Sequence, residues 1–359
     1  TIIAFVPHTT VGVAWTTPPL LSGYVATGSI NGSILQMINL GLGFLIYLPF
    51  VALSDAVREK HGKQVMHNLL QIASRCDFGS PDTRKCLNIP GEVGRLAHTL
   101  ATDLERSLNA NDGQLYLVFQ PQCDHTAKRV AGVEALLRWD HPIYGPVAPP
   151  IIVALAEDTN LIDRLGKFVL LEACKQRAAW HPAVPHDLVI AVNITPSQLR
   201  NANFAQMVLG TLHGLGLSPT QLELEITESS ILEPDARTLD LLTRLRVLGV
   251  RLAIDDFGMG HTSLRYIRAF PVTTVKVDRS LTESLNSNVQ EQIVRSILDL
   301  SRSLRITTVV EGVEDEQQLR VFTGIGYHTF QGYYFSRPLS SADCLDFVLR
   351  YNGQTDMEA

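Results

Sequence analysis

Two neighbouring carboxylates, Asp255 and Asp256, follow a short apolar run and precede a glycine-rich turn. Residues 250–254 (VRLAI) are typical of a strand covered on both faces, and Gly258 and Gly260 free the backbone just beyond its end. Two adjacent anions repel each other, so they stay ionised only beside a metal ion, beside an arginine or in contact with water. The pair alone is compatible with a cation site at a strand end and with a solvated turn.

The rest of the chain supplies strands that could bring further polar groups to the same place. The candidate strands are residues 115–120, 131–139, 188–194, 222–227, 250–255, 274–278, 306–311 and 329–334. Helical stretches such as 161–179, 236–248 and 289–304 lie between most of them. This alternation predicts a TIM-like (β/α)8 barrel or a doubly wound sheet, and eight candidate strands favour the barrel. The first two strands are too close in sequence for a helix between them, so we expect an antiparallel first hairpin.

In such a barrel, catalytic side chains come from the carboxyl ends of several strands. Besides the two aspartates, these ends carry Gln120, Glu134, Arg138, Asn193, Glu225, Glu228, Lys276, Asp278, Glu311 and Gln331. Each has a structural interpretation by itself, such as a buried ion pair between Glu134 and Arg138, but their joint placement argues against coincidence. Oxygen donors in this number, with one neutral amide and almost no histidine, predict Mg²⁺ or Mn²⁺ rather than zinc.

Composition excludes some classes of protein. The chain has 359 residues, enough for a barrel and further segments, and its net charge of −6 gives no support for a surface that binds a nucleic acid polymer. The five cysteines are odd in number, widely spaced and without a C-x-x-C motif. They argue against a disulfide framework or a zinc knuckle and are interpreted as reduced, cytosolic thiols.

The first part of the chain has a different character. No Asp, Glu, Lys or Arg occurs in residues 1–54, and residues 33–53 are long and apolar enough to cross a bilayer as a helix. Basic residues follow this stretch, so the positive-inside rule places the rest of the chain in the cytoplasm. A signal peptide is the competing interpretation, but its basic start and its cleavage site are missing. Because the chain begins at Thr1 within an apolar stretch, we expect a fragment whose earlier membrane segments are missing.

Residues 61–91 are broken by prolines and glycines and are interpreted as a linker, and an amphipathic helix is expected from Glu92, where the barrel domain 92–359 begins. Within residues 1–60, the motifs WTTPP (15–19) and YLPF (47–50) stand out. On these motifs the segment resembles the C-terminal end of a phosphotransferase-system sugar permease of the lactose/cellobiose type. That family builds its sugar site largely from earlier segments, so the remnant is not expected to transport alone. A generic membrane anchor is the alternative.

The barrel carries a second set of motifs. They are LVFQPQ, GVEALLRWDHP, LAEDTNLI, VNITPSQL, LELEITES, LAIDDFGMGHTSL, VKVDRS, VVEGVED and QGYYFSRPL, in this order. From about residue 92 to 349 the chain resembles the EAL family of cyclic-di-GMP phosphodiesterases, whose signature is Glu134-Ala135-Leu136. The resemblance implies hydrolysis of one phosphodiester bond of cyclic-di-GMP to 5′-pGpG at two metal ions. Together with the apolar segment 33–53, it predicts an enzyme at the bacterial inner membrane with the catalytic domain in the cytoplasm.

The resemblance also implies roles for single residues. The implied metal ligands are Glu134, Asn193, Glu225, Asp255, Asp256 and Glu311, with Asp255 shared between two ions. Lys276 would orient or help activate the attacking water and offset phosphate charge, and Glu311 would bind that water or act as a base. Gln120 and Arg138 would contact the dinucleotide, and Gln331 and Asp278 would complete the site. Glu228 would anchor the loop 256–263, which links metal binding to a homodimer interface in that family.

The loop departs slightly from the family pattern, because Gly258-Met259-Gly260-His261-Thr262 stands where Gly-Thr-Gly-Tyr-Ser is usual. No proposed metal ligand is lost, and no Gly-Gly-Asp/Glu-Glu-Phe sequence occurs. Two alternatives to a phosphodiesterase remain open. One is a catalytically silent receptor for cyclic-di-GMP, and the other is a regulatory appendage of a sugar permease.

Overall fold

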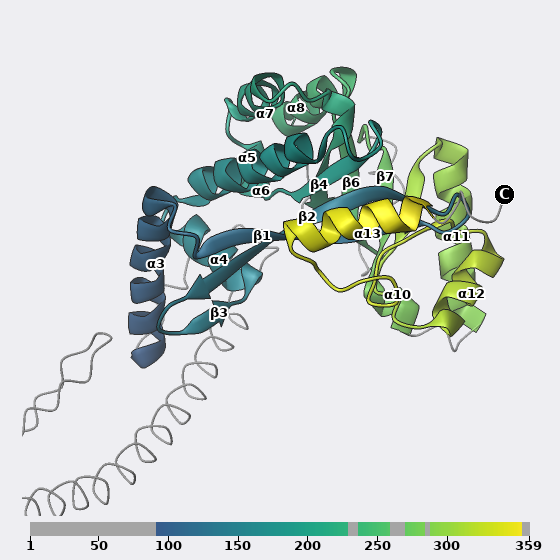
Figure 1. The fold of residues 1–359 in the computed structure, drawn as a ribbon, viewed down its shortest axis with the longest axis horizontal. Coiled ribbons are helices and arrows are strands. Elements are labelled where there is room, and N and C mark those ends of the chain that lie inside the picture. Colours follow the sequence, from purple (N-terminus) through teal and green to yellow (C-terminus); the bar gives the residue numbers. More distant parts are fainter. Residues whose placement is uncertain (1–90, 229–235, 259–269, 284–287, 354–359) are drawn as a thin grey trace, which may run out of the picture. The chain divides into compact units, whose positions relative to one another are not determined.

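The computed structural model describes residues 91–228, 236–258, 270–283 and 288–353 (Figure 1). The strands are β1 (Leu115–Asp124), β2 (Arg129–His141), β3 (Gly145–Val147), β4 (Val189–Asn193), β5 (Leu222–Thr227), β6 (Arg251–Phe257), β7 (Thr274–Val277), β8 (Thr307–Val310) and β9 (Thr329–Phe330). The helices are α3 (Glu92–Ala110), α4 (Pro149–Asp158), α5 (Ile162–Trp180), α6 (Pro196–Leu199), α7 (Phe204–Gly214), the 3-10 helix η1 (Pro219–Gln221), α8 (Ala236–Val247), α10 (Arg279–Glu283), α11 (Asn288–Leu304), α12 (Glu316–Ile325) and α13 (Ser341–Gly353).

Eight of the strands close into a barrel. Their order is β1-β9-β8-β7-β6-β5-β4-β2, and β1 pairs with β2 to complete the ring. Strand β1 runs antiparallel to both of its neighbours, whereas the pairs from β2–β4 to β8–β9 are parallel. The barrel and its antiparallel first hairpin are therefore confirmed. The short strand β3, which pairs with the far end of β2, was not predicted from the sequence.

The two faces of the strands differ in chemistry because side chains alternate along a strand. Leu222, Leu224 and Ile226 of β5 belong to the hydrophobic core that the surrounding helices cover. Glu223 and Glu225 alternate with them and are also buried, on the inner face of the barrel. The core therefore lies mainly between strands and helices, and the barrel interior carries polar groups.

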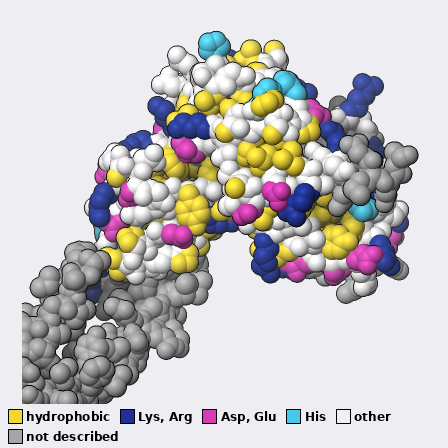
Figure 2. All heavy atoms as spheres, in the orientation of Figure 1, with side chains coloured by type: hydrophobic (Ala, Val, Ile, Leu, Met, Phe, Trp, Pro, Cys, Tyr) yellow, Lys and Arg dark blue, Asp and Glu magenta, His cyan; other side chains and the backbone are white. Residues whose placement is uncertain are grey.

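Helix α3 lies beside the barrel and packs against α4 and α5 (Figure 1). Its apolar stripe of Leu96, Leu100 and Leu104 is buried, which confirms the amphipathic helix expected from Glu92. At the other end of the chain, α13 packs on β1 and β2, so the last helix covers the first hairpin. On the face shown in Figure 2, acidic and basic side chains are interspersed among apolar ones rather than gathered by sign.

The expected membrane segment lies outside the described residues, as do the expected linker and most of the loop 256–263. In the part of the chain that the structure describes, no helix combines the length and the hydropathy that crossing a membrane requires.

Candidate active site

Lys276 is the centre of the candidate site. Its side chain is 1% exposed, and its Nζ contacts four carboxylates at 2.8–3.3 Å. The contacts are Glu311 Oε1 at 2.8 Å, Glu225 Oε2 at 3.0 Å, Glu134 Oε2 at 3.2 Å and Asp255 Oδ1 at 3.3 Å. Groups from five different segments thus meet within the barrel, as the strand-end pattern predicts.

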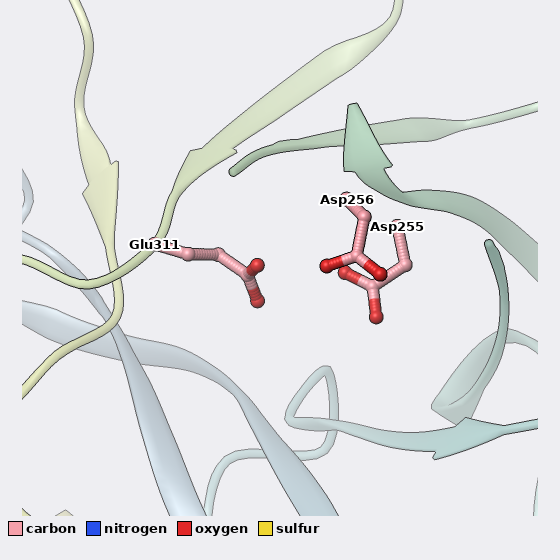
Figure 3. A group of neighbouring side chains, drawn as sticks. All are labelled: Asp255, Asp256 and Glu311. Atoms are coloured by element: carbon pink, nitrogen blue, oxygen red, sulfur yellow. The ribbon is translucent and has the colours of Figure 1, made fainter. Parts of the chain in front are cut away.

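Asp255 and Asp256 show how a strand can aim two neighbouring side chains at one place. In a regular strand they would point to opposite faces. Here the register between β6 and β7 shifts between Ile254 and Phe257, and Asp256 has a left-handed φ of 56°, which aspartate tolerates better than most residues. Figure 3 shows the carboxylates of Asp255, Asp256 and Glu311 facing one another, and they offer oxygen atoms within 4.8 Å of one another.

The turn after the two aspartates is held by Glu228. Glu228 is buried, and its Oε2 accepts a hydrogen bond of 2.8 Å from the backbone N–H of Gly258. Gly258 has a φ of 109°, and a Cβ there would lie 2.4 Å from Leu281 Cδ1. The left-handed φ and the close Leu281 side chain both favour glycine at this position. The hydrogen bond from Gly258 connects the start of the loop that follows to Glu228.

Glu134 on β2 is positioned by two amides in addition to the lysine. Its Oε1 accepts a hydrogen bond from Asn193 Nδ2 at 2.7 Å, and its Oε2 accepts one from Gln331 Nε2 at 2.6 Å. Burial by itself would raise the pKa of Glu134, but the ammonium of Lys276 and the two amide donors lower it below its usual value. Glu134 is therefore held as an anion with both oxygens oriented.

For the other carboxylates of the site, burial and neighbouring negative charge outweigh the effect of Lys276 and raise the pKa. Burial and the charge of Glu134 raise the pKa of Glu225 well above its usual value. Burial raises the pKa of Glu311 to about 8, against the opposing effect of Lys276, and burial with the neighbouring Asp255 raises that of Asp256 to about 6. Burial alone would lower the pKa of Lys276, but the carboxylates raise it well above its usual value. More negative charge is gathered here than one ammonium can neutralise.

Carboxylate oxygens without hydrogen bonds indicate that the residues fit a hard divalent cation. Among the described residues, neither carboxylate oxygen of Glu225 nor Oδ1 of Asp255 has a partner in hydrogen-bonding geometry, although Lys276 Nζ is near. Five carboxylates around one ammonium leave a formal charge that two divalent cations would cancel. Carboxylate oxygens are the ligands that Mg²⁺ and Mn²⁺ prefer.

The remaining predicted residues lie around this centre. Gln120 Nε2 donates to the backbone carbonyl of Ser336 at 3.1 Å, and Gln120 Oε1 accepts from Gln331 at 3.2 Å. The ion pair considered between Glu134 and Arg138 is not formed, because the Arg138 guanidinium donates to the backbone carbonyl of Leu137 instead. Asp278 Oδ1 accepts from the backbone N–H of Ser280 at 2.8 Å and so holds the start of α10.

Two buried polar residues deeper in the barrel, Glu223 and Gln122, were not predicted as site residues from the sequence. Glu223 Oε2 accepts a hydrogen bond of 2.5 Å from Thr274 Oγ1, and burial raises its pKa. Gln122 Nε2 donates to Gln331 Oε1 at 3.1 Å. Both residues stand two positions before or after a predicted site residue, and strand alternation places them on the same inner face. That spacing is the signal that could have identified them.

Residues 101–338 match the EAL domain family. The chain belongs to the EAL domain family. The EAL domain of this chain is similar to the cyclic di-GMP phosphodiesterase NbdA of Pseudomonas aeruginosa, with 37% identity over 258 residues, 72% of this chain and 33% of that protein. Among solved structures it is similar to the PaMucR phosphodiesterase in complex with c-di-GMP, with 36% identity and a TM-score of 0.65, over 68% of this chain and 99% of that one.

The Klebsiella pneumoniae BlrP1 complex with calcium and cyclic-di-GMP is also similar to this EAL domain. It has 30% identity and a TM-score of 0.56, over 63% of this chain and 56% of that one. The chain spans about a third of the length of the curated relatives it matches, with shares of 37%, 30% and 28% for three of them.

Proposed function

We propose that this protein is a metal-dependent cyclic-di-GMP phosphodiesterase that opens one phosphodiester bond to give linear 5′-pGpG. The observation that carries the proposal is Lys276 Nζ surrounded by four buried or half-buried carboxylates, of which Glu225 keeps its Oε1 without a hydrogen bond. Relatives that are cyclic-di-GMP phosphodiesterases by name, and a relative solved with that ligand, support the choice of substrate.

The cation site follows from the oxygen donors. Glu134, Asn193, Glu225 and Asp255 would hold one Mg²⁺ or Mn²⁺ ion, and Asp255 with Asp256 a second. When bound, such cations make water more acidic and stabilise negative charge on phosphate oxygens. Asn193 gives Glu134 its hydrogen bond through Nδ2, which leaves its amide oxygen available as a neutral ligand.

The protein's own groups account for the rest of the chemistry. Water attacks phosphorus, a new P–O bond forms, the bond to the 3′ oxygen breaks, and that oxygen leaves as a hydroxyl after it takes a proton from solvent water. Lys276 would offset phosphate charge, and Glu311, 2.8 Å from Lys276 Nζ, would accept the proton of the attacking water once cation binding has displaced the proton of its own carboxyl. Arg138 and Gln120 bind the dinucleotide, since a guanidinium can donate twice to one phosphate.

The test is hydrolysis of cyclic-di-GMP by the full chain with Mg²⁺ or Mn²⁺, followed by chromatography of the products. We expect 5′-pGpG from the native chain and none from Glu134→Ala or in EDTA. Tight binding of cyclic-di-GMP without product under all metal conditions would show that the protein is a catalytically silent receptor and not an enzyme.

We also propose that residues 1–60 anchor the protein in the bacterial inner membrane, that residues 61–91 link this anchor to the domain 92–359, and that the domain is cytoplasmic. The apolar stretch 33–53 and the basic residues after it support this arrangement. The likeness of 1–60 to a sugar permease remains a sequence-based prediction. Carbonate extraction of membranes tests the anchor, because a peripheral protein would be released and a spanning one retained.

A homodimer through the loop 256–263 and neighbouring helices is the expected assembly. The hydrogen bond from Gly258, at the start of this loop, to the buried Glu228 supports a coupling between the loop and the site. Sedimentation of the full chain in detergent, with and without Mg²⁺, measures the assembly. A monomer at concentrations where cyclic-di-GMP is hydrolysed would contradict a requirement for the dimer.

A further inference from the structure

Three residues form a continuous hydrogen-bonded chain from the deep interior of the barrel to Glu134, and Gln120 forms a branch from its middle member. Gln122 Nε2 donates to Gln331 Oε1 at 3.1 Å. Gln331 Nε2 in turn donates to Glu134 Oε2 at 2.6 Å and to Gln120 Oε1 at 3.2 Å. Gln122 and Gln331 are each 4% exposed, so solvent offers no ready substitute for these partners.

The orientation of the Gln331 side-chain amide is determined by its two neighbours, Gln122 and Glu134. A primary amide has one acceptor end and one donor end. If the Gln331 amide turned over, its Oε1 would face the Glu134 carboxylate, and two acceptors at that distance repel each other. The donor of Gln122 favours the observed orientation, because the turned amide would bring two donor groups together there. Gln122 and Glu134 thus select the same orientation of one amide.

The backbone leaves room for Gln122 at this place. Gln122 on β1 is paired with Gly132 on β2, and the register between these strands shifts directly after Gln122. A Cβ on residue 132 would lie 2.7 Å from Gln122 Oε1. The absence of a side chain at Gly132, two residues before Glu134, lets the Gln122 amide lie inside the barrel.

We propose that Gln122 is a positioning residue for the cation site, which acts by holding the Gln331 amide with its donor end on Glu134. The proposal rests on the proposed function, since Glu134 is a metal ligand only if the site holds a cation. Groups that orient a metal ligand typically change metal affinity or activity about 10–100-fold when they are lost.

The experiment is a calorimetric titration of the metal-free full chain with Mn²⁺ alone, beside steady-state hydrolysis at several Mn²⁺ concentrations. Gln122→Met removes the donor with little change in volume, and we expect Mn²⁺ affinity to fall by about 10-fold or more. We expect kcat to recover largely at saturating Mn²⁺. Gln122→Glu keeps the shape but in its ionised form offers only acceptors to Gln331 Oε1, so its loss of affinity should exceed that of Gln122→Met at the pH values where it is ionised.

Gln221→Met is the matched control. Gln221 is also a buried glutamine, and its Nε2 donates to the carbonyl of His186 at 2.7 Å, at the amino end of β5. The Gln221→Met substitution should lower the melting temperature of the protein without changing its Mn²⁺ affinity. If Gln122→Met and Gln122→Glu behave like this control, with native Mn²⁺ affinity, the proposal is wrong while the proposed function stands. If the native chain itself binds no Mn²⁺ and hydrolyses nothing, both fall.

A second pair of variants tests the same proposal without removing the glutamine. Gly132→Ala should displace the Gln122 amide and weaken Mn²⁺ binding, whereas in a Gln122→Ala background the same substitution should have little effect. An equal loss of affinity in both backgrounds would show that residue 132 acts independently of Gln122 and would overturn the proposal.

Discussion

Lys276 carries the positive charge that allows the carboxylates around it to coexist when no cation is bound. Its Nζ contacts Glu134, Glu225, Asp255 and Glu311 from the inside of the barrel. A buried cluster of like charges is strongly unfavourable unless a counter-ion compensates it. The lysine therefore stabilises the metal-free protein, and in the proposed mechanism it would have a second function beside the phosphate of a substrate.

Lys276→Met should separate these two functions. In EDTA at pH 8 we expect a loss of about 3–5 kcal/mol in the free energy of unfolding, since the carboxylates lose their buried partner. Saturating Mg²⁺ should restore much of this stability, while hydrolysis stays undetectable. Urea unfolding with and without Mg²⁺ measures both effects. Native-like stability in EDTA would show that the carboxylates do not depend on the ammonium.

Glu311 links cation binding to pH. Burial raises its pKa to about 8 in the metal-free protein, so near pH 7 the carboxyl holds a proton that a cation must displace. Mg²⁺ affinity should therefore rise as the pH increases from 6 to 8, and binding at pH 7 should release protons. Calorimetry in buffers of different ionisation enthalpy counts these protons. Glu311→Gln should reduce the number released, and an unchanged number would exclude Glu311 as their source.

At the scale of elements, a hydrogen bond beneath the site joins β5 to β7, two strands that are not neighbours in the sheet. Glu223 on β5 accepts from Thr274 on β7, across the intervening strand β6, on which Arg251 pairs with Glu223 and Ala253 pairs with Thr274. Glu223 and Thr274 each stand two residues before a site residue, Glu225 and Lys276. The bond therefore helps to align β5 and β7 so that Glu225 and Lys276 lie at the same level of the barrel.

Thr274→Val should lower the free energy of unfolding by about 1–3 kcal/mol, because the buried Glu223 carboxyl loses its donor. Thr323→Val is the matched control, since Thr323 Oγ1 on α12 is buried without a hydrogen bond among the described residues. The control should be neutral or slightly stabilising. Chemical denaturation of both variants gives the comparison, and equal effects would argue against a contribution from the Glu223–Thr274 bond.

The sequence predicted the elements better than it predicted the interior. Strand patterns identified the eight barrel strands and the antiparallel first hairpin, because each strand alternates or runs apolar for several residues. Strand alternation could have placed Gln122 and Glu223 on the inner face, but it could not show that they bond to Gln331 and Thr274. It also could not show that Lys276 contacts four acids at once, because such contacts join segments far apart in the chain.

At the scale of the whole molecule, cation binding and folding should be coupled. A ligand that binds only the folded state stabilises it, by about 2.7 kcal/mol when its concentration is 100 times Kd. For a domain of this size we expect the melting temperature to rise by about 5–10 °C in saturating Mg²⁺ or Mn²⁺. Asp255→Asn, which weakens the shared ligand, should abolish most of this rise. Calorimetric scans of both proteins, with and without metal, decide the matter, and an equal rise in the variant would place the stabilising cation elsewhere.

The pairing of β1 with both β2 and β9 affects the order in which a growing chain can become active. During synthesis on the ribosome, β1 and β2 can form their hairpin early, but the ring closes only when β9 arrives. The hydrogen bond from Gln122 to Gln331 joins residues 209 positions apart. Contacts of such long range form late and slowly. A chain still attached to the ribosome, or one cut short before residue 331, would therefore lack a complete site, so we expect unfinished copies to be unable to carry out the proposed hydrolysis.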